Sequence, residues 1–157
     1  MNENDTIQTV KNRLGDKVLE IANPSPRRIF LKVDRSDLAE TVLFLKSEFD
    51  YSVVSTISGV DRGEHFEVLY HLTNADAALS VRVLSPRPDP RIPSICGIIP
   101  GAILYERELQ DMFGLVVEGI PDPRPLLLPD DWPAGAFPLR KDWTFERPPE
   151  VIPGGGR

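Results

Sequence analysis

Four charged residues crowd about two turns of an expected helix over residues 103–113, and they form the part of the chain best suited to chemistry. They are Glu106, Arg107, Glu108 and Asp111. Glu108 and Asp111 share one helix face, where two carboxylates repel each other unless a cation lies against them. The carboxylates could serve as a general acid and base. The other interpretation is a solvated or ion-paired face, with Arg107 and Asp111 paired at a spacing of four. We favour the second because no nucleophile or cofactor-binding loop accompanies them.

Basic residues follow in a proline-rich stretch from residue 121 onward, which we call the tail. Arg124, Arg140 and Lys141 lie there among prolines. Proline fixes φ and removes backbone donors, so the tail should run extended, without helical neighbours to neutralise these cations. Their carboxylate partners must lie on the 103–113 helix or on another chain. We expect Arg140 to lie between Glu108 and Asp111, because a planar guanidinium can hold a carboxylate by two hydrogen bonds.

Aromatic residues punctuate the same tail. Trp132, Phe137 and Trp143 occur between its prolines. Aromatic and arginine side chains are the usual anchors of protein interfaces. The tail is therefore expected to lie along a partner chain. The domain should fold alone, whereas the chain after Leu84 should be only partly ordered without the partner, because it has few backbone hydrogen bonds of its own.

Other candidate sites are weaker. His65 and His71 lie six residues apart on an expected strand, roughly 20 Å by strand rise, so they cannot share one metal ion within the chain. Cys96 is the single cysteine and is interpreted as a buried apolar residue, not as a nucleophile. The glycines form no phosphate-binding loop. No cofactor is therefore expected in this chain.

Length and charge restrict the class of protein. The chain has 157 residues, suited to one hydrophobic core, and a net charge of −6 with a pI near 4.9. An acidic surface argues against nucleic acid as a partner, because phosphate binding needs basic residues. The sequence shows no basic, apolar leader and no run of about 20 apolar residues. We expect a cytoplasmic protein that meets a membrane only indirectly.

Residues 100–142 resemble the signature of the 30 kDa subunit of NADH:quinone oxidoreductase (respiratory complex I) and of its relatives in membrane-bound, energy-converting [NiFe] hydrogenases. Weaker resemblance extends back to about residue 50. Ile120 and Pro125 stand where the respiratory family usually has a histidine and a second basic residue, which favours the hydrogenase branch. The matching residues are Glu106-Arg107-Glu108, Asp111-Met112-Phe113-Gly114, Gly119, Pro121-Asp122, Arg124, Leu126-Leu127, Pro129-Asp130-Asp131-Trp132 and Pro138-Leu139-Arg140-Lys141-Asp142.

The resemblance implies a non-catalytic structural subunit of a membrane-associated, ion-translocating oxidoreductase complex. It implies docking onto a hydrogenase-like large subunit beside a small iron–sulfur subunit, peripheral on the cytoplasmic side of the membrane. Iron–sulfur clusters or nickel would belong to those partners. The alternative is a free-standing soluble acidic enzyme that uses Glu106, Glu108 and Asp111. The expected interface residues are Glu106, Arg107, Glu108, Asp111, Gly114, Pro121, Arg124, Trp132, Arg140, Lys141 and Asp142.

The elements that position these residues can be predicted from periodicity. A single helix over 4–22 is an alternative for the first region, and Asn23-Pro24-Ser25-Pro26 is expected to form a hairpin turn. Ser80 and Arg82 should face water. The segment SPRPDPRIP after Leu84 should be a loop that leaves the domain. The expected helices are 4–14, 36–49 and 103–113, and the expected strands are 17–21, 28–33, 53–57, 66–72 and 79–83.

This order of elements predicts an α+β fold, a two-layer domain in which helices cover a sheet. The resemblance implies that the sheet is mixed. The organisation expected is a sheet domain over 1–85, the signature helix and extended partner-binding tail of the same domain over 86–147, and a flexible terminus over 148–157.

Overall fold

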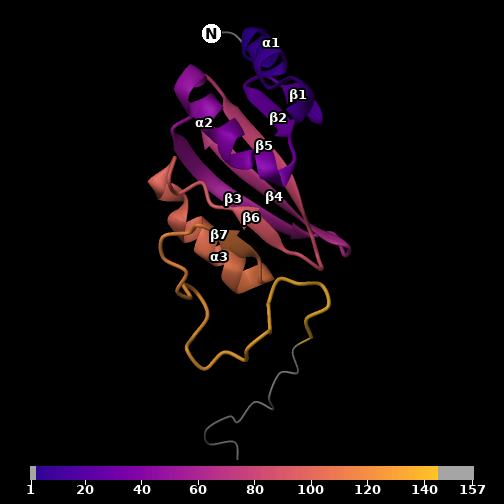
Figure 1. Cartoon of the computed structure of the whole chain (residues 1–157), viewed down its shortest axis with the longest axis vertical. Coiled ribbons are helices and arrows are strands. Elements are labelled where there is room, and N and C mark those ends of the chain that lie inside the picture. Colours follow the sequence, from indigo (N-terminus) through magenta and orange to yellow (C-terminus); the bar gives the residue numbers. More distant parts are fainter. Residues whose placement is uncertain (1–2, 145–157) are drawn as a thin grey trace, which may run out of the picture.

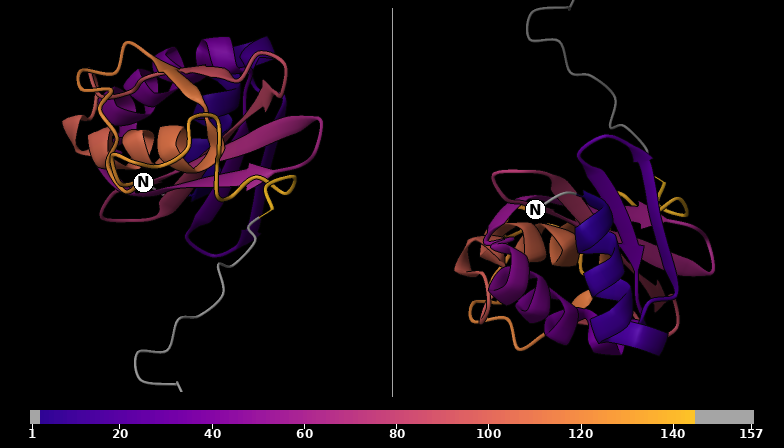
Figure 2. Two further views of the ribbon diagram at one scale, coloured as in Figure 1. Left: turned by 90° about the horizontal axis from the view of Figure 1, so that it is seen from below. Right: turned by 90° about the horizontal axis from the view of Figure 1, so that it is seen from above.

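A computed structural model describes residues 3–144, so the terminus predicted over 148–157 lies outside the described residues. In this part of the chain five strands form one sheet in the order β1-β2-β5-β4-β3. The β2 and β5 strands pair in parallel and the other neighbours are antiparallel. Helices cover one face of the sheet (Figures 1 and 2). The predicted two-layer α+β fold with a mixed sheet is therefore confirmed.

The elements within residues 3–144 have the following bounds. They are α1 (Glu3–Leu14), β1 (Glu20–Ser25), β2 (Arg28–Lys32), α2 (Leu38–Phe49), β3 (Val53–Asp61), β4 (His65–Thr73), β5 (Ala78–Pro86), β6 (Arg91–Pro93), α3 (Ile103–Phe113) and β7 (Val116–Glu118). Short 3-10 turns precede α2 at Arg35–Asp37 and α3 at Pro100–Ala102, and another follows α1 at Gly15–Lys17.

The core lies between the sheet and its helices because side chains alternate along each strand. Phe66, Val68, Tyr70 and Leu72 of β4 point to the same face and are completely buried. They pair across with the inward residues of β3 and β5. A single hydrophobic cluster runs from α1 through α3 and β7. The predicted alternation of β4 is confirmed.

The N-terminal hairpin differs from its prediction. Gly15 adopts a φ of +52° and ends α1, so the alternative of one helix over 4–22 is wrong. The first strand is displaced toward the C-terminus and continues to Ser25, past the predicted turn, with an irregularity after Ala22. The chain turns between Ser25 and Arg28, where Arg27 has a φ of 63°. Pro24 is accommodated because β1 is an edge strand, where a missing N–H is tolerated.

The sheet face opposite the helices carries polar side chains that cover one another. Ser80 was expected to face water, but it is 7% exposed and its Oγ lies 2.8 Å from Nδ1 of His71. Glu67 is equally buried because Arg62 and Arg82 reach across it, at 2.8 and 3.4 Å. Long side chains folding over the sheet thus bury groups that alternation alone assigns to solvent.

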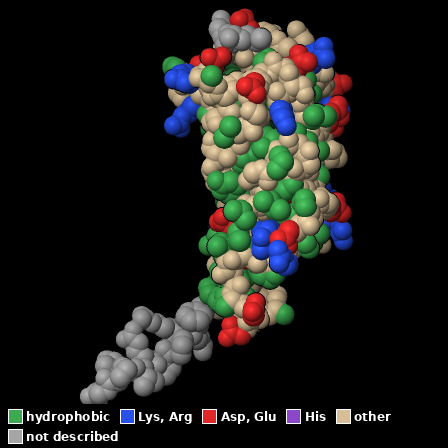
Figure 3. Space-filling model, turned by 90° about the vertical axis from the view of Figure 1, so that its left-hand side faces the viewer, with side chains coloured by type: hydrophobic (Ala, Val, Ile, Leu, Met, Phe, Trp, Pro, Cys, Tyr) green, Lys and Arg blue, Asp and Glu red, His purple; other side chains and the backbone are tan. Residues whose placement is uncertain are grey.

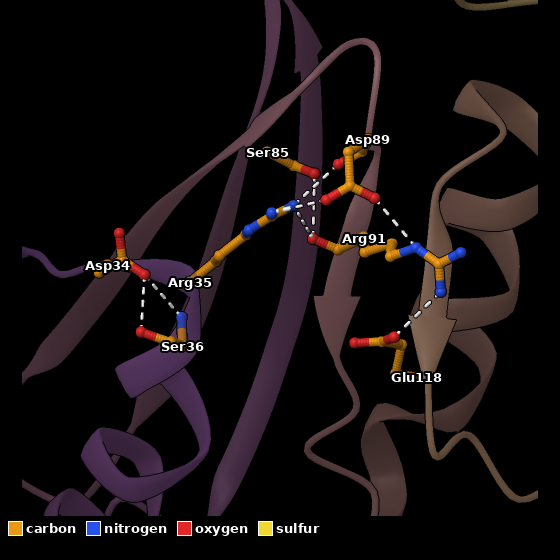
Figure 4. A network of polar contacts seen from close by, with 7 residues as sticks. All are labelled: Asp34, Arg35, Ser36, Ser85, Asp89, Arg91 and Glu118. Carbon is orange, nitrogen blue, oxygen red and sulfur yellow. Dashed lines mark hydrogen bonds and ion pairs between the residues drawn. The ribbon is translucent and has the colours of Figure 1, made fainter.

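The proline-rich segment after Leu84 stays on the domain, contrary to its prediction. Ile92, in β6, is completely buried, and β6 pairs in parallel with β7. Arg35 holds the segment from the helix side: its guanidinium donates to Oδ2 of Asp89 at 2.7 Å and to the carbonyls of Asp89 and Arg91 (Figure 4). Arg91 in turn bonds Asp89 and Glu118. These side chains provide hydrogen-bond partners for the backbone of this segment, because its prolines prevent it from pairing as a longer strand.

Candidate functional site: the α3 helix and the tail that follows it

The α3 helix is placed against the sheet by a close approach. Pro100 begins the turn that leads into it, and Gly114, with a φ of 65°, ends it by donating its N–H to the carbonyl of Gln110. Leu109 and Phe113 face the sheet, where Gly59 has no side chain to obstruct them. A Cβ at Gly59 would lie 2.5 Å from the Phe113 ring. This contact fixes which α3 residues point inward.

Glu106 lies on the inner side of α3 and is completely buried. Its carboxylate accepts hydrogen bonds from Ser94 Oγ at 2.6 Å, Ile95 N–H at 2.7 Å and Cys96 Sγ at 3.1 Å. The expectation that Glu106 belongs to a solvated or ion-paired face is therefore wrong, because these neutral donors replace water. Glu106 fastens the segment after β6 to α3.

Cys96 is buried beside this carboxylate, as predicted for an apolar residue. Burial and the neighbouring Glu106 raise the pKa of Cys96 to about 11, so it remains a thiol at neutral pH. The hydroxyl of Tyr70 is buried and has no hydrogen-bond partner among residues 3–144, and burial and Glu106 also raise its pKa.

Asp111 lies under the tail and is 8% exposed. Its Oδ2 accepts three successive backbone N–H groups, from Leu126 at 2.8 Å, Leu127 at 2.7 Å and Leu128 at 3.3 Å. Three donors in an extended segment would be unpaired without this oxygen. The predicted pair between Arg107 and Asp111 is therefore wrong, because Asp111 accepts hydrogen bonds from the tail backbone instead.

Arg107 also binds the tail. It donates to the carbonyls of Arg124 and Pro125, both at 2.8 Å, and pairs with Asp122 at 3.3 Å. Arg124 closes the same cluster by bonding both carboxylate oxygens of Asp122. Hydrogen bonds from Arg124 lower the pKa of Asp122. Arg124 thus has a carboxylate partner in the tail itself, where the sequence suggested α3 or another chain.

Arg140 does not lie between Glu108 and Asp111. Its Nε donates to the carbonyl of Phe113 at 2.6 Å, and its guanidinium lies 4.3 Å from the Phe137 ring centre and 5.1 Å from that of Phe66. The carbonyl of Phe113 at the C-terminus of α3 and two aromatic faces therefore replace the predicted carboxylates. Gly114 permits this packing, since a side chain there would collide with Phe137 and Arg140.

A second carboxylate that sequence reasoning missed holds the end of the tail. Asp61, 3% exposed at the end of β3, accepts N–H groups from Gly63 at 2.8 Å and Lys141 at 2.9 Å, and a guanidinium from Arg87. Arg87 also pairs with Asp142 at 2.8 Å. Burial raises the pKa of Asp61, but the bonds from Lys141, Gly63 and Arg87 outweigh it and lower the pKa to about 2. The sequence signal was the Asp61-Arg62-Gly63 turn, which identifies the local bond only.

The remaining predicted residues lie at the surface of this assembly. Pro121 and Lys141 are exposed, and Trp132 donates its Nε1–H to the carbonyl of Ala136 at 2.8 Å. Within residues 3–144 the side chain of Glu108 has no recorded hydrogen bond or ion pair, although it is half-buried. The structure therefore separates the three α3 carboxylates: Glu106 faces the core, Asp111 the tail and Glu108 the outside.

Apolar side chains accompany Glu108 on the outer surface. Leu104 precedes it by one helical turn and is 53% exposed, and Leu127, in the tail that Asp111 holds, is 54% exposed. Leu126 and Leu139 are exposed as well. Figure 3 shows hydrophobic side chains gathered across the middle of one side of the molecule, above a cluster of acidic and basic groups.

Both histidines lie on β4. The ring of His71 lies between Ser58 Oγ at 3.2 Å and Ser80 Oγ at 2.8 Å, and burial lowers its pKa. His65 begins the same strand.

Of the helices formed by residues 3–144, none is long and apolar enough to cross a bilayer.

Comparison with known proteins gives a consistent set of similarities. Residues 31–149 match the family model "Respiratory-chain NADH dehydrogenase, 30 Kd subunit". The chain is 38% identical over 148 residues to the NADH-quinone oxidoreductase subunit designated C of Chloroherpeton thalassium, a match that covers 88% of this chain and 60% of that protein. It is 37% identical over 121 residues to the NADH-quinone oxidoreductase subunit with the joint designation C/D of Methylococcus capsulatus, covering 67% of this chain and 20% of that protein. Among solved structures, the trypsin-resistant fragment (1–134) of Nqo5 is similar, with a TM-score of 0.65 and 25% identity, covering 78% of this chain and 99% of that one.

Proposed function

Because the chain belongs to the family of the 30 kDa subunit of respiratory-chain NADH dehydrogenase, we propose that it is a non-catalytic structural subunit of a membrane-associated, ion-translocating oxidoreductase complex. The complex is of the complex I or energy-converting hydrogenase type. The chain docks onto the hydrogenase-like large subunit, beside the small iron–sulfur subunit. It lies in the peripheral arm on the cytoplasmic side, and the clusters or nickel belong to its partners.

The observation that carries this proposal is Glu108. The neighbouring charged residues of the signature segment, Arg107 and Asp111, are engaged with the tail of the same chain, whereas Glu108 has no recorded partner within residues 3–144. Glu108 lies one helical turn from the exposed Leu104, so a basic and apolar surface that covers this side of α3 would give its carboxylate a partner. The joint designation C/D of one relative supports docking onto a neighbouring subunit of the same complex.

The alternative of a free-standing enzyme finds less support in the geometry. Glu106 and Asp111 each accept three hydrogen bonds on opposite sides of α3, from the core and from the tail. They therefore form no common site with Glu108 at which one substrate could meet all three.

Charge reversal at Glu108 tests the docking surface. We expect Glu108→Arg to lower incorporation of the chain into its complex by about tenfold, as loss of a buried charge partner does. The matched control is Glu48→Arg, because Glu48 is an exposed glutamate on α2, away from this surface. Incorporation is measured by affinity purification of the complex and quantitation of each subunit. Complexes that do assemble should keep near-normal turnover. If Glu108→Arg assembled fully and lost turnover instead, Glu108 would belong to catalysis and the structural role would be wrong.

A further inference from the structure

A pocket of about 270 Å³ lies between α3 and the loop that the tail forms over residues 125–137. Gln110 and Asp111 line it from the helix side. Its walls are largely apolar, and they are formed by Pro125, Leu128, Pro129, Trp132, Pro133 and Phe137. A pocket of this size holds one side chain, not a folded segment.

The charge of the pocket is one-sided. Asp111 and Asp130 line it, and none of its other lining residues within the described part of the chain is charged. The three amide bonds to Asp111 all end on Oδ2, and within residues 3–144 no donor to Oδ1 is recorded. Oδ1 of Asp111 therefore remains available to accept a hydrogen bond from an occupant of the pocket. Charge complementarity therefore selects a positively charged occupant.

The walls are held in place before any occupant arrives. Pro125, Pro129 and Pro133 recur every four residues and restrict the backbone around the opening. The Trp132 indole is fixed by its bond to the carbonyl of Ala136, and its ring lies 6.0 Å from that of Trp143. A rigid aromatic wall opposite a carboxylate suits a planar cation, which can lie against the ring while it donates to the oxygen.

We propose that this pocket receives one arginine side chain from a neighbouring subunit. The guanidinium lies against Trp132 and donates to Oδ1 of Asp111, and Asp130 adds a second negative charge. Arginine suits the site better than lysine because its cation is planar and stays charged when desolvated. The inference rests on the proposed function, since it requires a partner subunit.

The first test uses the full chain and L-arginine methyl ester as the probe. The indole Nε1–H resonance of Trp132, assigned with the Trp143→Phe variant, should shift saturably. Citrulline methyl ester has a similar shape without the charge and should bind at least about tenfold more weakly, and lysine methyl ester should also be weaker. A missing shift, or equal responses to arginine and either analogue, would overturn the proposal.

Variants locate the binding. Ala136→Leu fills the pocket and removes no polar contact, because Trp132 bonds the backbone of Ala136; it should abolish the shift. Asp130→Asn should weaken binding about threefold to tenfold, and Asp131→Asn, whose carboxyl does not line the pocket, by less than about twofold. Circular dichroism confirms that each variant is folded. A response that survives Ala136→Leu unchanged would overturn the site.

The assembled complex separates this proposal from the proposed function. Ala136→Leu should lower the amount of this chain per large subunit at least about fivefold, and Asp131→Asn should not. Full incorporation of Ala136→Leu would overturn the arginine pocket and leave the structural role intact. The structural role itself fails if the unmodified chain purifies without other subunits.

Discussion

Buried carboxylates organise the irregular parts of this chain at the scale of single residues. Asp61, Glu106 and Asp111 each accept backbone N–H groups from segments that have no ladder of their own. A buried N–H without a partner costs about 1–3 kcal/mol. One acidic side chain that accepts several N–H groups therefore supplies the acceptors that a neighbouring strand would otherwise provide. Asp61, Glu106 and Asp111 thus stabilise the fold, whereas Glu108 makes no hydrogen bond or ion pair within residues 3–144.

Asp61→Asn should destabilise the protein in a pH-dependent way. The pKa of Asp61 is about 2 in the folded state and about 3.9 in an unfolded chain, a difference worth about 2–3 kcal/mol. Because the carboxylate form is stabilised, the contribution is complete above about pH 5, falls to about half near pH 3 and vanishes below pH 2. Urea unfolding at pH 7, 4 and 3 measures it, with Asp131→Asn as control. A deficit that did not shrink on acidification would contradict this.

Several residues that the sequence singled out bind partners other than the ones predicted for them. Asp111 was expected to lie against a cation, but its donors are backbone amides. Every residue except proline has such an amide, so residue types alone do not identify this partner. Arg140 was given a carboxylate, whereas a helix-end carbonyl and two aromatic rings receive it. The link from Asp61 to Lys141 spans 80 residues and leaves no local pattern.

At the scale of elements, helices and strands with a clear hydrophobic periodicity were predicted more accurately than those with a weak one. The α3 helix and β4 were placed correctly because their apolar positions recur over several turns or pleats. The edge strands β1 and β3 were shifted or shortened, since an edge strand buries less and alternates less clearly. Strands of three residues, β6 and β7, are shorter than any detectable period.

Gly114 at the end of α3 should be the most sensitive of the left-handed glycines to substitution. Gly63→Ala, at a φ of +89° with open space around it, should cost about 1–2 kcal/mol of unfolding free energy. Gly114→Ala adds a collision with Phe137 and Arg140, and should cost about 1–3 kcal/mol more. Chemical unfolding of the two variants side by side checks this. Equal losses would show that the tail does not pack against Gly114 in solution.

At the scale of the whole molecule, the helices and the sheet form the core, and polar side chains bind the tail to that core. The α+β class could be predicted from the order of elements, but the parallel pairing of β2 with β5 could not, because order alone leaves strand direction open. The path of the tail depends on bonds between residues 15 to 80 positions apart. The proline content predicted irregular structure in the tail, but it did not predict that the tail bonds to α3.

Two separate anchors should keep the tail ordered in the isolated chain, in contrast to the partner dependence that its composition suggested. Amide hydrogen exchange of the full chain should show protection at residues 126–128, whose N–H groups meet Asp111, and at Lys141, which meets Asp61. Asp111→Ala should speed exchange at 126–128 by about tenfold or more, because each lost bond contributes about 1 kcal/mol. Protection at Lys141 should persist, since its acceptor is untouched. Glu108→Ala, one turn away and without a recorded bond in residues 3–144, is the matched control and should change neither. If residues 126–128 exchanged freely in the unmodified chain, the tail would acquire its order only from a partner.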